Sequence, residues 1–400
     1  MTCHYFIFKY NYNKLEEYKI GVLFAQKGEF GSSEQPIINA IQLATEEINQ
    51  QGGFGGRKIK LVFEDLEEGG LDFKGLSEKL IRDQKVSVLF ACWTSACRKE
   101  VKPVVEKYNS LMIYTNQYEG VEESSHMIYL GATPNQQLIP AVKWMMDHFG
   151  KRVYLVGSDY IYPHVSNKLA KLQISSLQGE IVGERYVPLK SHELNNLIKD
   201  IVQTKPDFIL NTLNGDANID FFNSLLKMNN HPIPVMSLSL ADGMVAKISP
   251  HYYSNMYSAW TYLSSSENER NKQFLDKYRL KFGSTKDLND PAVTAYAAMY
   301  LLQQAIKSAP NIKPRVIRDK LLRQSSASPA GAIYIDPLNG HGWRTLYITN
   351  RASDGSHLLK WSSVAPIRPI VYPKLQTKLE WEFFTYKLYL NWDKSWGKIY

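Results

Sequence analysis

Strand-like apolar runs alternate with helical patterns along most of this 400-residue chain, and that alternation constrains its fold more than any other feature. The first run covers 19–24, and a helical pattern with Ile37, Ile41, Ala44 and Ile48 on one stripe follows it. Strands that alternate with helices pair in parallel. The pattern therefore predicts an α/β protein built on doubly wound sheets.

The alternation occurs in two series of similar size. The second series begins after a predicted helix at 135–149, and the pattern predicts that the chain returns to the first series at about residue 262. This organisation predicts two Rossmann-like lobes joined by several crossings, with a hinge that closes the cleft between them. We expect an N-terminal extension at 1–18, a first lobe at 19–136 plus 262–330, a second lobe at 137–261 plus 331–372, and a helical tail at 373–400.

Composition excludes several classes of protein. The 47 basic and 39 acidic residues leave a formal net charge of +8, but the basic residues are scattered, which indicates a solvated surface rather than a nucleic-acid face. No apolar window reaches the roughly 18 residues that a membrane span needs, so we expect no direct membrane insertion. The segment 1–19 lacks a small-residue cleavage site, and no export signal is visible.

The chain carries no motif that predicts catalysis or a cofactor. Its three cysteines, Cys3, Cys92 and Cys97, are an odd number at spacings that predict neither a disulfide framework nor a zinc site. The glycine-rich segment 52–56 follows a helix and precedes a strand, which is the reverse of a phosphate-binding order, so we interpret it as a turn. We expect a protein without metal or cofactor that is not an enzyme.

Polar and aromatic residues recur just after predicted strands. In open α/β sheets this is where ligands bind. The clearest example is Trp93-Thr94-Ser95, where a buried strand becomes a helix. Either hydroxyl could be a helix cap and nothing more, but a bulky indole at such a turn is typical of a wall for a flat ligand. The other segments of this kind contain Tyr118 and Glu119, Asp159 and Tyr160, Asn214, and Trp260; Ser33 and Glu34 begin the first long helix.

Several of these segments, in order along the chain, resemble the type I solute-binding proteins, and within them the branch that contains urea transporter binding proteins and the amide sensor of amidase operons. The resemblance runs from 19 to about 372. Its motifs are Cys92-Trp93-Thr94-Ser95-Ala96 with Arg98-Lys99, Gln117-Tyr118-Glu119-Gly120, Gly131-Ala132 with Pro134-Asn135-Gln136-Gln137, 154–160, Tyr186-Val187-Pro188-Leu189, 211–216, Asp290-Pro291, Ile335-Asp336-Pro337 and Trp361-Ser362-Ser363.

The resemblance implies a protein that captures urea or a short-chain amide in the cleft and delivers it to an ABC transporter permease. It also implies ligand roles for the residues after the strands. Acceptors for ligand N–H groups are Glu119, Asp159 and Glu34; donors to its carbonyl are the hydroxyls of Thr94 and Ser95; flat walls are Trp93, Tyr118, Tyr160 and Trp260; Asn214 and Ser33 complete the set.

Two segments depart from the family pattern. Residues 25–28 read Ala-Gln-Lys-Gly where the family usually has Leu-Ser-Gly, and 115–116 read Thr-Asn where a proline is common. A cytoplasmic amide sensor with a regulatory partner, or a binding protein for branched-chain amino acids, therefore stays open as an alternative. A transporter subunit would be periplasmic if an export signal is missing from this start site, whereas the sensor would be cytoplasmic.

Overall fold

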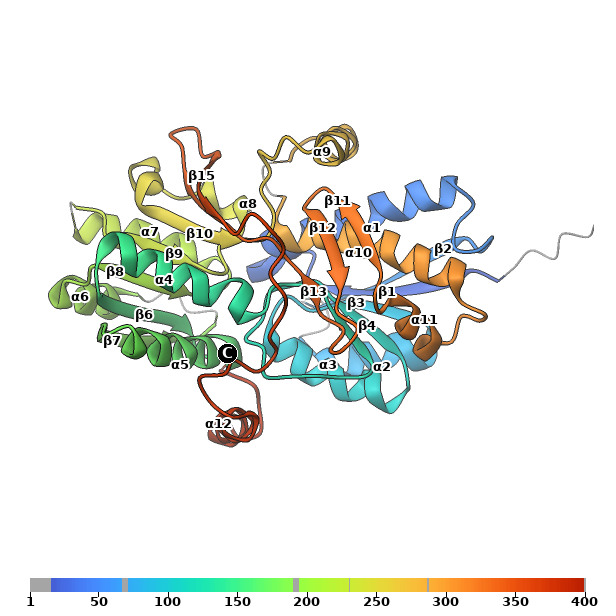
Figure 1. The fold of residues 1–400 in the computed structure, drawn as a ribbon, viewed down its shortest axis with the longest axis horizontal. Helices are drawn as coiled ribbons and strands as arrows, with labels where there is room; N and C mark the ends of the chain where they lie inside the picture. The colour runs from blue at the N-terminus through green and yellow to red at the C-terminus, as the bar shows by residue number, and fades with distance from the viewer. Residues whose placement is uncertain (1–15, 67–70, 190–193, 230, 286–287, 399–400) are drawn as a thin grey trace, which may run out of the picture.

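The computed structural model describes residues 16–66, 71–189, 194–229, 231–285 and 288–398. They form two α/β lobes that lie side by side, with a helix near the C-terminus set apart from both sheets (Figure 1). The predicted N-terminal extension lies, up to residue 15, outside the described residues. Within the described ranges, no helix is both long enough and apolar enough to span a bilayer.

The first lobe is built on a five-stranded parallel sheet in the order β2-β1-β3-β4-β5. Helices cover both faces, so β3 and β4 are apolar and buried throughout, as strands of a parallel sheet usually are. The elements are β1 Tyr18–Phe24, α1 Gly31–Gln50, β2 Ile59–Asp65, α2 Phe73–Glu78, β3 Val88–Ala91, α3 Ser95–Lys107, β4 Leu111–Tyr114, β5 Met127–Tyr129, α9 Glu269–Phe282, α10 Asp290–Ser308 and α11 Pro314–Leu321.

The second lobe carries a seven-stranded sheet in the order β15-β14-β10-β9-β8-β6-β7. Strands β6 to β10 are parallel, and β14 and β15 add to the β10 edge in antiparallel fashion. The elements are α4 Leu138–Phe149, β6 Arg152–Ser158, α5 Ile161–Ser176, β7 Glu180–Val187, α6 Asn195–Thr204, β8 Phe208–Thr212, α7 Ala217–Met228, β9 Val235–Ser237, α8 Asp242–Val245, β10 Met256–Trp260, β14 Tyr347–Arg351 and β15 His357–Ser362.

The fold class predicted from the alternating pattern is confirmed: two doubly wound α/β lobes. The assignment of the whole segment 331–372 to the second lobe needs correction. Strands β11 Ser325–Ser328, β12 Gly331–Ile335 and β13 Gly342–Trp343 form a separate antiparallel sheet, and Tyr129 of β5 forms a bridge with His341 beside β13. Only β14 and β15 join the second lobe, because β10 offers them a free edge.

A buried cluster of three polar side chains, Thr261, Asp290 and Arg344, holds the crossings between the lobes together. Asp290, at the start of α10, accepts hydrogen bonds from the backbone N–H and the hydroxyl of Thr261, both at 2.5 Å. Arg344, just after β13, donates to the Thr261 hydroxyl at 2.9 and 2.6 Å and to Asp290 at 3.2 Å. Since Thr261 and Arg344 lie on two different crossings, these bonds tie both crossings to the start of α10.

The predicted terminal helix is confirmed as α12 Lys378–Asn391. It begins with a capping box, in which Thr377 and Glu380 satisfy each other's backbone amides. Trp381 anchors the helix, because its ring is fully buried and its Nε1 donates to the Pro373 carbonyl at 3.0 Å.

Candidate functional site

In each lobe the strand order reverses beside the lobe's first strand, and several of the residues predicted to bind ligand follow the strands at these reversals. In the first lobe the reversal lies between β1 and β3, which lead to Glu34 and Trp93 respectively. In the second lobe it lies between β6 and β8, which lead to Tyr160 and Asn214. Ligands of open α/β sheets bind at such reversals, so the topology favours the predicted location.

The turn from β3 into α3 is closed by two local bonds. Thr94 is the N-cap of α3, and its hydroxyl accepts from the Cys97 backbone N–H at 3.2 Å. A disulfide joins Cys92 to Cys97 across the same turn. The sequence argument found no disulfide framework and missed this single bond: the turn brings two residues five apart to a Cα separation of 5.5 Å, a contact that an odd cysteine count does not reveal.

Trp93 connects the two lobes directly. Its indole Nε1 donates to Asn214 Oδ1 at 3.0 Å, and its ring is buried. Its own backbone carbonyl accepts from Tyr114 Oη at 3.2 Å and from Asn116 Nδ2 at 2.8 Å, which ties the turn to the end of β4. Trp93 and Asn214, predicted separately, are thus brought together.

Ser95 and Glu119 are also brought together, by a buried arginine. The Ser95 hydroxyl donates to Glu119 Oε2 at 2.5 Å and accepts from Arg98 Nη1 at 2.7 Å. Arg98 also donates to Glu119 at 2.7 Å and to Glu122 at 3.0 Å, and its guanidinium has no exposed surface. Burial lowers the pKa of Arg98, but the charges of Glu119 and Glu122 more than offset this and hold it well above its usual range.

Tyr118 packs against the same network, and its ring is buried rather than exposed along a cleft. Its ring stacks on Tyr129 at 5.3 Å and lies 4.6 Å from the Arg98 guanidinium carbon, while its hydroxyl is 2.5 Å from His341 Nε2. Because His341 Nδ1 lies 2.8 Å from the Asn339 carbonyl, Nδ1 is the donor and Nε2 accepts the Tyr118 proton. Burial lowers the pKa of His341 to about 4.

From the second lobe, Tyr160 and Tyr162 face this network. Burial raises the pKa of Tyr160 well above its usual range, and the neighbouring Tyr162, Tyr114 and Glu119 raise it further. Burial is also the main cause of the raised pKa of Tyr162, and hydrogen bonding with Ser239 and Ser166 lowers it in part. Tyr162 carries no motif, and the sequence argument missed it although it is two residues from Tyr160.

Glu34 and Thr94 line a small cavity of about 10 Å³ at the reversal of the first sheet, together with Ala25, Phe30 and Leu189. The Glu34 carboxylate accepts the backbone N–H of Ala25 at the end of β1. Ser33, one residue before Glu34, is fully buried, and its hydroxyl oxygen has no hydrogen-bond partner.

Two predicted residues lie away from this centre. Asp159 is 2.8 Å from His164 and 3.2 Å from Lys398, near the C-terminus. Burial would raise the pKa of Asp159, but the hydrogen bonds with these two partners lower it below its usual range. Trp260 ends β10, at the crossing that leads to Thr261.

The lobes touch through further direct bonds. Glu29 accepts from the Asp216 backbone N–H at 2.8 Å, and Ser32 donates to the Asp216 carboxylate at 3.3 Å. Gln117 donates to the Leu238 carbonyl at 3.2 Å. Gly215 permits the first contact, since a Cβ there would lie 2.3 Å from the Glu29 carboxylate. The described arrangement is therefore a closed one.

Comparison with known proteins identifies the family. The model of the periplasmic binding protein domain matches residues 18–378. The chain belongs to this family. A periplasmic binding protein has two α/β lobes, which agrees with the observed sheets.

Individual relatives of this periplasmic binding protein are distant. Leu/Ile/Val-binding protein homolog 6 of Brucella melitensis biotype 1 is 20% identical over 352 residues, which cover 86% of this chain and 90% of the relative. A solute binding protein of an ABC transporter from R. palustris, solved with 4-hydroxybenzoate, has a TM-score of 0.77 at 20% identity and covers 86% of this chain and 95% of its own. The LivJ substrate binding protein of Streptococcus pneumoniae, solved with isoleucine, has a TM-score of 0.75 at 19% identity and covers 88% of this chain and 100% of its own.

The neutral, buried His341 gives a testable pH dependence. Below about pH 6.5 an unfolded histidine takes up a proton, whereas His341 in the folded protein does so only near a pKa of about 4. Its contribution to stability is thus present above pH 6.5 and is lost as the pH falls toward 4. We expect the parent to lose up to about 1.4 kcal/mol per pH unit more than His341→Gln across this window.

The measurement is guanidinium unfolding at stepped pH. The control is His251→Gln, which changes an exposed histidine. Equal pH slopes for the parent and His341→Gln would contradict a neutral His341.

Proposed function

We propose that this chain captures urea or a short-chain amide between its lobes and hands it to an ABC transporter. The observation that carries the proposal is the small size of a cavity at the first sheet reversal, which is lined by Glu34 and Thr94 of the first lobe and reached by Leu189 of the second. The cavity between Glu34 and Thr94 measures about 10 Å³, close to the roughly 10 to 15 Å³ that one water molecule needs on the same kind of measure. A ligand of few atoms suits this space better than a large aromatic or aliphatic one.

The polar groups around the cleft complement such a ligand. Urea and short amides offer N–H donors and one carbonyl, and each group left unpaired on burial costs about 1 to 3 kcal/mol. We assign the Glu34 and Glu119 carboxylates as acceptors for the N–H groups, and the buried Ser33 hydroxyl, which has no hydrogen-bond partner, as the group available to the carbonyl. Arg98 compensates Glu119, so the site has little net charge to attract an ionic ligand.

A branched-chain amino acid is the second candidate. The names of the Brucella relative and of the Streptococcus pneumoniae neighbour favour it, since both refer to leucine, isoleucine or valine or to branched-chain amino acids. Such a ligand would need the lobes to separate further than in the described arrangement, and it would need donors for its carboxylate. The N-terminus of α3, with Thr94 and Ser95, is the place where they could be supplied.

The Cys92–Cys97 disulfide bears on where the protein works. Disulfides persist in oxidising compartments and are rare in the cytosol. The bond therefore supports a periplasmic or extracellular transporter subunit over the cytoplasmic amide sensor. Catalysis has no support among the described residues, where the polar groups of the cleft pair with one another rather than around a nucleophile.

The ligand is tested by a thermal-shift panel of urea, formamide, acetamide, leucine and isoleucine at millimolar concentration. We expect an amide or urea to raise the melting temperature, because a ligand that binds only the native state adds RT ln(1 + [L]/Kd) to its stability. A shift with the amino acids alone would reject the amide assignment in favour of the second candidate.

Trp93→Ala tests the place of the site. It removes the wall above the cleft and the N–H that reaches Asn214, so we expect at least a tenfold weaker affinity, or about 1.4 kcal/mol. Calorimetric titration with the ligand found in the panel measures it. The control, Trp361→Ala, removes a partly exposed tryptophan of β15 and should bind as the parent does. If Trp93→Ala folds and binds like the parent, the ligand does not occupy this cleft.

The compartment is tested by alkylating the protein from native cells after denaturation but without prior reduction, since Cys92 and Cys97 are buried in the folded protein. We expect Cys92 and Cys97 to stay unlabelled and both to react after reduction, as mass spectrometry of the peptides would report. Labelling of both without reduction would favour the cytoplasmic sensor.

A further inference from the structure

Residues 396–398 lie against the face of the second lobe that carries Tyr160. Gly397 forms an antiparallel bridge with Tyr160. On either side of it, the Ile161 N–H donates to the Trp396 carbonyl at 2.9 Å, and the Lys398 N–H donates to the Asp159 carbonyl at 2.8 Å. Leu189, which lines the small cavity, donates its N–H to the Lys398 carbonyl at 3.3 Å.

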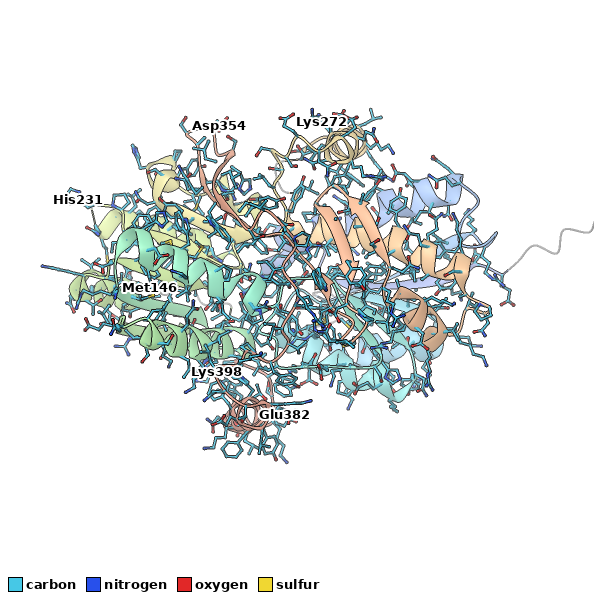
Figure 2. All side chains as sticks on the ribbon, viewed as in Figure 1. Met146, His231, Lys272, Asp354, Glu382 and Lys398 are labelled. Atoms are coloured by element: carbon cyan, nitrogen blue, oxygen red, sulfur yellow. A yellow bond between two sulfur atoms is a disulfide. The ribbon has the colours of Figure 1, made fainter. Side chains whose placement is uncertain are left out.

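Side chains strengthen this attachment to the second lobe. Lys398 pairs with Asp159 at 3.2 Å, which accounts for the position of a carboxylate predicted to meet the ligand. Trp392, just after α12, meets the His164 ring edge-on at 5.0 Å. Lys398 and Glu382 are labelled in Figure 2, where the tail lies below the region in which the two lobes meet.

The same segment also reaches the first lobe. The Lys99 ammonium, on α3, lies 5.2 Å from the centroid of the Trp396 ring. Trp396 and Ser395 share a cavity of about 210 Å³ with Phe73, Lys74 and Glu100 of the first lobe. At its other end, α12 is tied to the first lobe by an ion pair of 3.6 Å between Lys378 and Glu123.

These contacts define the position of the tail. From Lys378, which pairs with the first lobe, α12 runs along α5 of the second lobe. The segment after α12 then lies over the start of α5, and the Trp396 ring contacts α3. Opening of the cleft would have to separate Trp396 from Lys99 or Gly397 from Tyr160. The family match ends at residue 378, so α12 beyond its first residue and the segment after it lie outside that match.

We propose that residues 395–398 act as a positioning element for ligand binding: they fix Tyr160 and Tyr162 against the cleft and hold the closed lobes together through Trp396 and Lys99. This inference rests on the proposed capture of a ligand between the lobes. The segment does not touch the ligand; it raises affinity because a larger fraction of the protein is already closed. The apparent Kd is the intrinsic Kd divided by the closed fraction, so loss of closure weakens binding in proportion.

Two substitutions separate the two attachments. Trp396→Ala removes the ring above Lys99 and leaves the backbone bridge to the second lobe. Gly397→Ala breaks the bridge, because a Cβ on Gly397 would lie 2.2 Å from the Tyr160 Cβ. Trp396→Phe restores a ring above Lys99, and Lys394→Ala is the matched control, since it changes an exposed residue of the same tail.

Solution scattering of the full chain without ligand measures closure, and calorimetric titration with urea, or with whichever compound of the panel binds, measures affinity. We expect Trp396→Ala and Gly397→Ala to have a larger radius of gyration than the parent and at least fivefold weaker binding. Trp396→Phe should recover most of both, and Lys394→Ala should match the parent.

The outcomes separate this inference from the proposed function. If no compound of the panel binds the parent, the amide and amino-acid assignments fail, yet the scattering still decides whether the tail holds the lobes. Parent-like scattering and affinity in both Trp396→Ala and Gly397→Ala would overturn the inference, as would a loss of affinity that Trp396→Phe does not rescue.

Discussion

The bonds of the buried Arg98 are the interactions on which the side of the first lobe that faces the second depends. A guanidinium with no exposed surface is held by Glu119, Glu122 and Ser95. Removing one partner of such a buried pair costs about 3 to 5 kcal/mol, because the remaining charges lose their compensation. Arg98 therefore ties the start of α3 to the segment after β4, and it sets the orientation of both the hydroxyl and the carboxylate that face the second lobe.

This network explains why the two lobes differ in how they form their side of the cleft. In the first lobe the turn after β3 is closed covalently by Cys92–Cys97, capped by Thr94 and supported by Arg98. In the second lobe the Asp159 N–H donates to the Val187 carbonyl of β7 at 2.6 Å, and the C-terminal segment adds the bonds of Ile161 to Trp396 and of Lys398 to Asp159. One side of the cleft is thus closed by bonds within its own lobe, and the other also receives bonds from a remote part of the chain.

The sequence pattern was sufficient for the architecture, because burial on both faces of a parallel sheet leaves apolar runs that alternate with amphipathic helices. It also located the turns after β3, β6 and β8, since ligand sites of this fold class lie at strand ends. It could not identify partners that are distant in the sequence. The bonds of Asp159 to Lys398, of Trp93 to Asn214 and of Tyr118 to His341 span 239, 121 and 223 residues, and local periodicity carries no information about them.

The Cys92–Cys97 pair shows a different limit of the same reasoning. An argument from the number of cysteines looks for disulfides that join distant segments, whereas this disulfide closes a single turn. Cys92 has a φ of 72°, so the chain leaves β3 in a conformation that is uncommon for a residue with a side chain. A bond across the turn and a cap at Thr94 both hold that conformation, and together they place Trp93 toward Asn214. Residues whose bonds are local to the backbone turn therefore present the indole to the other lobe.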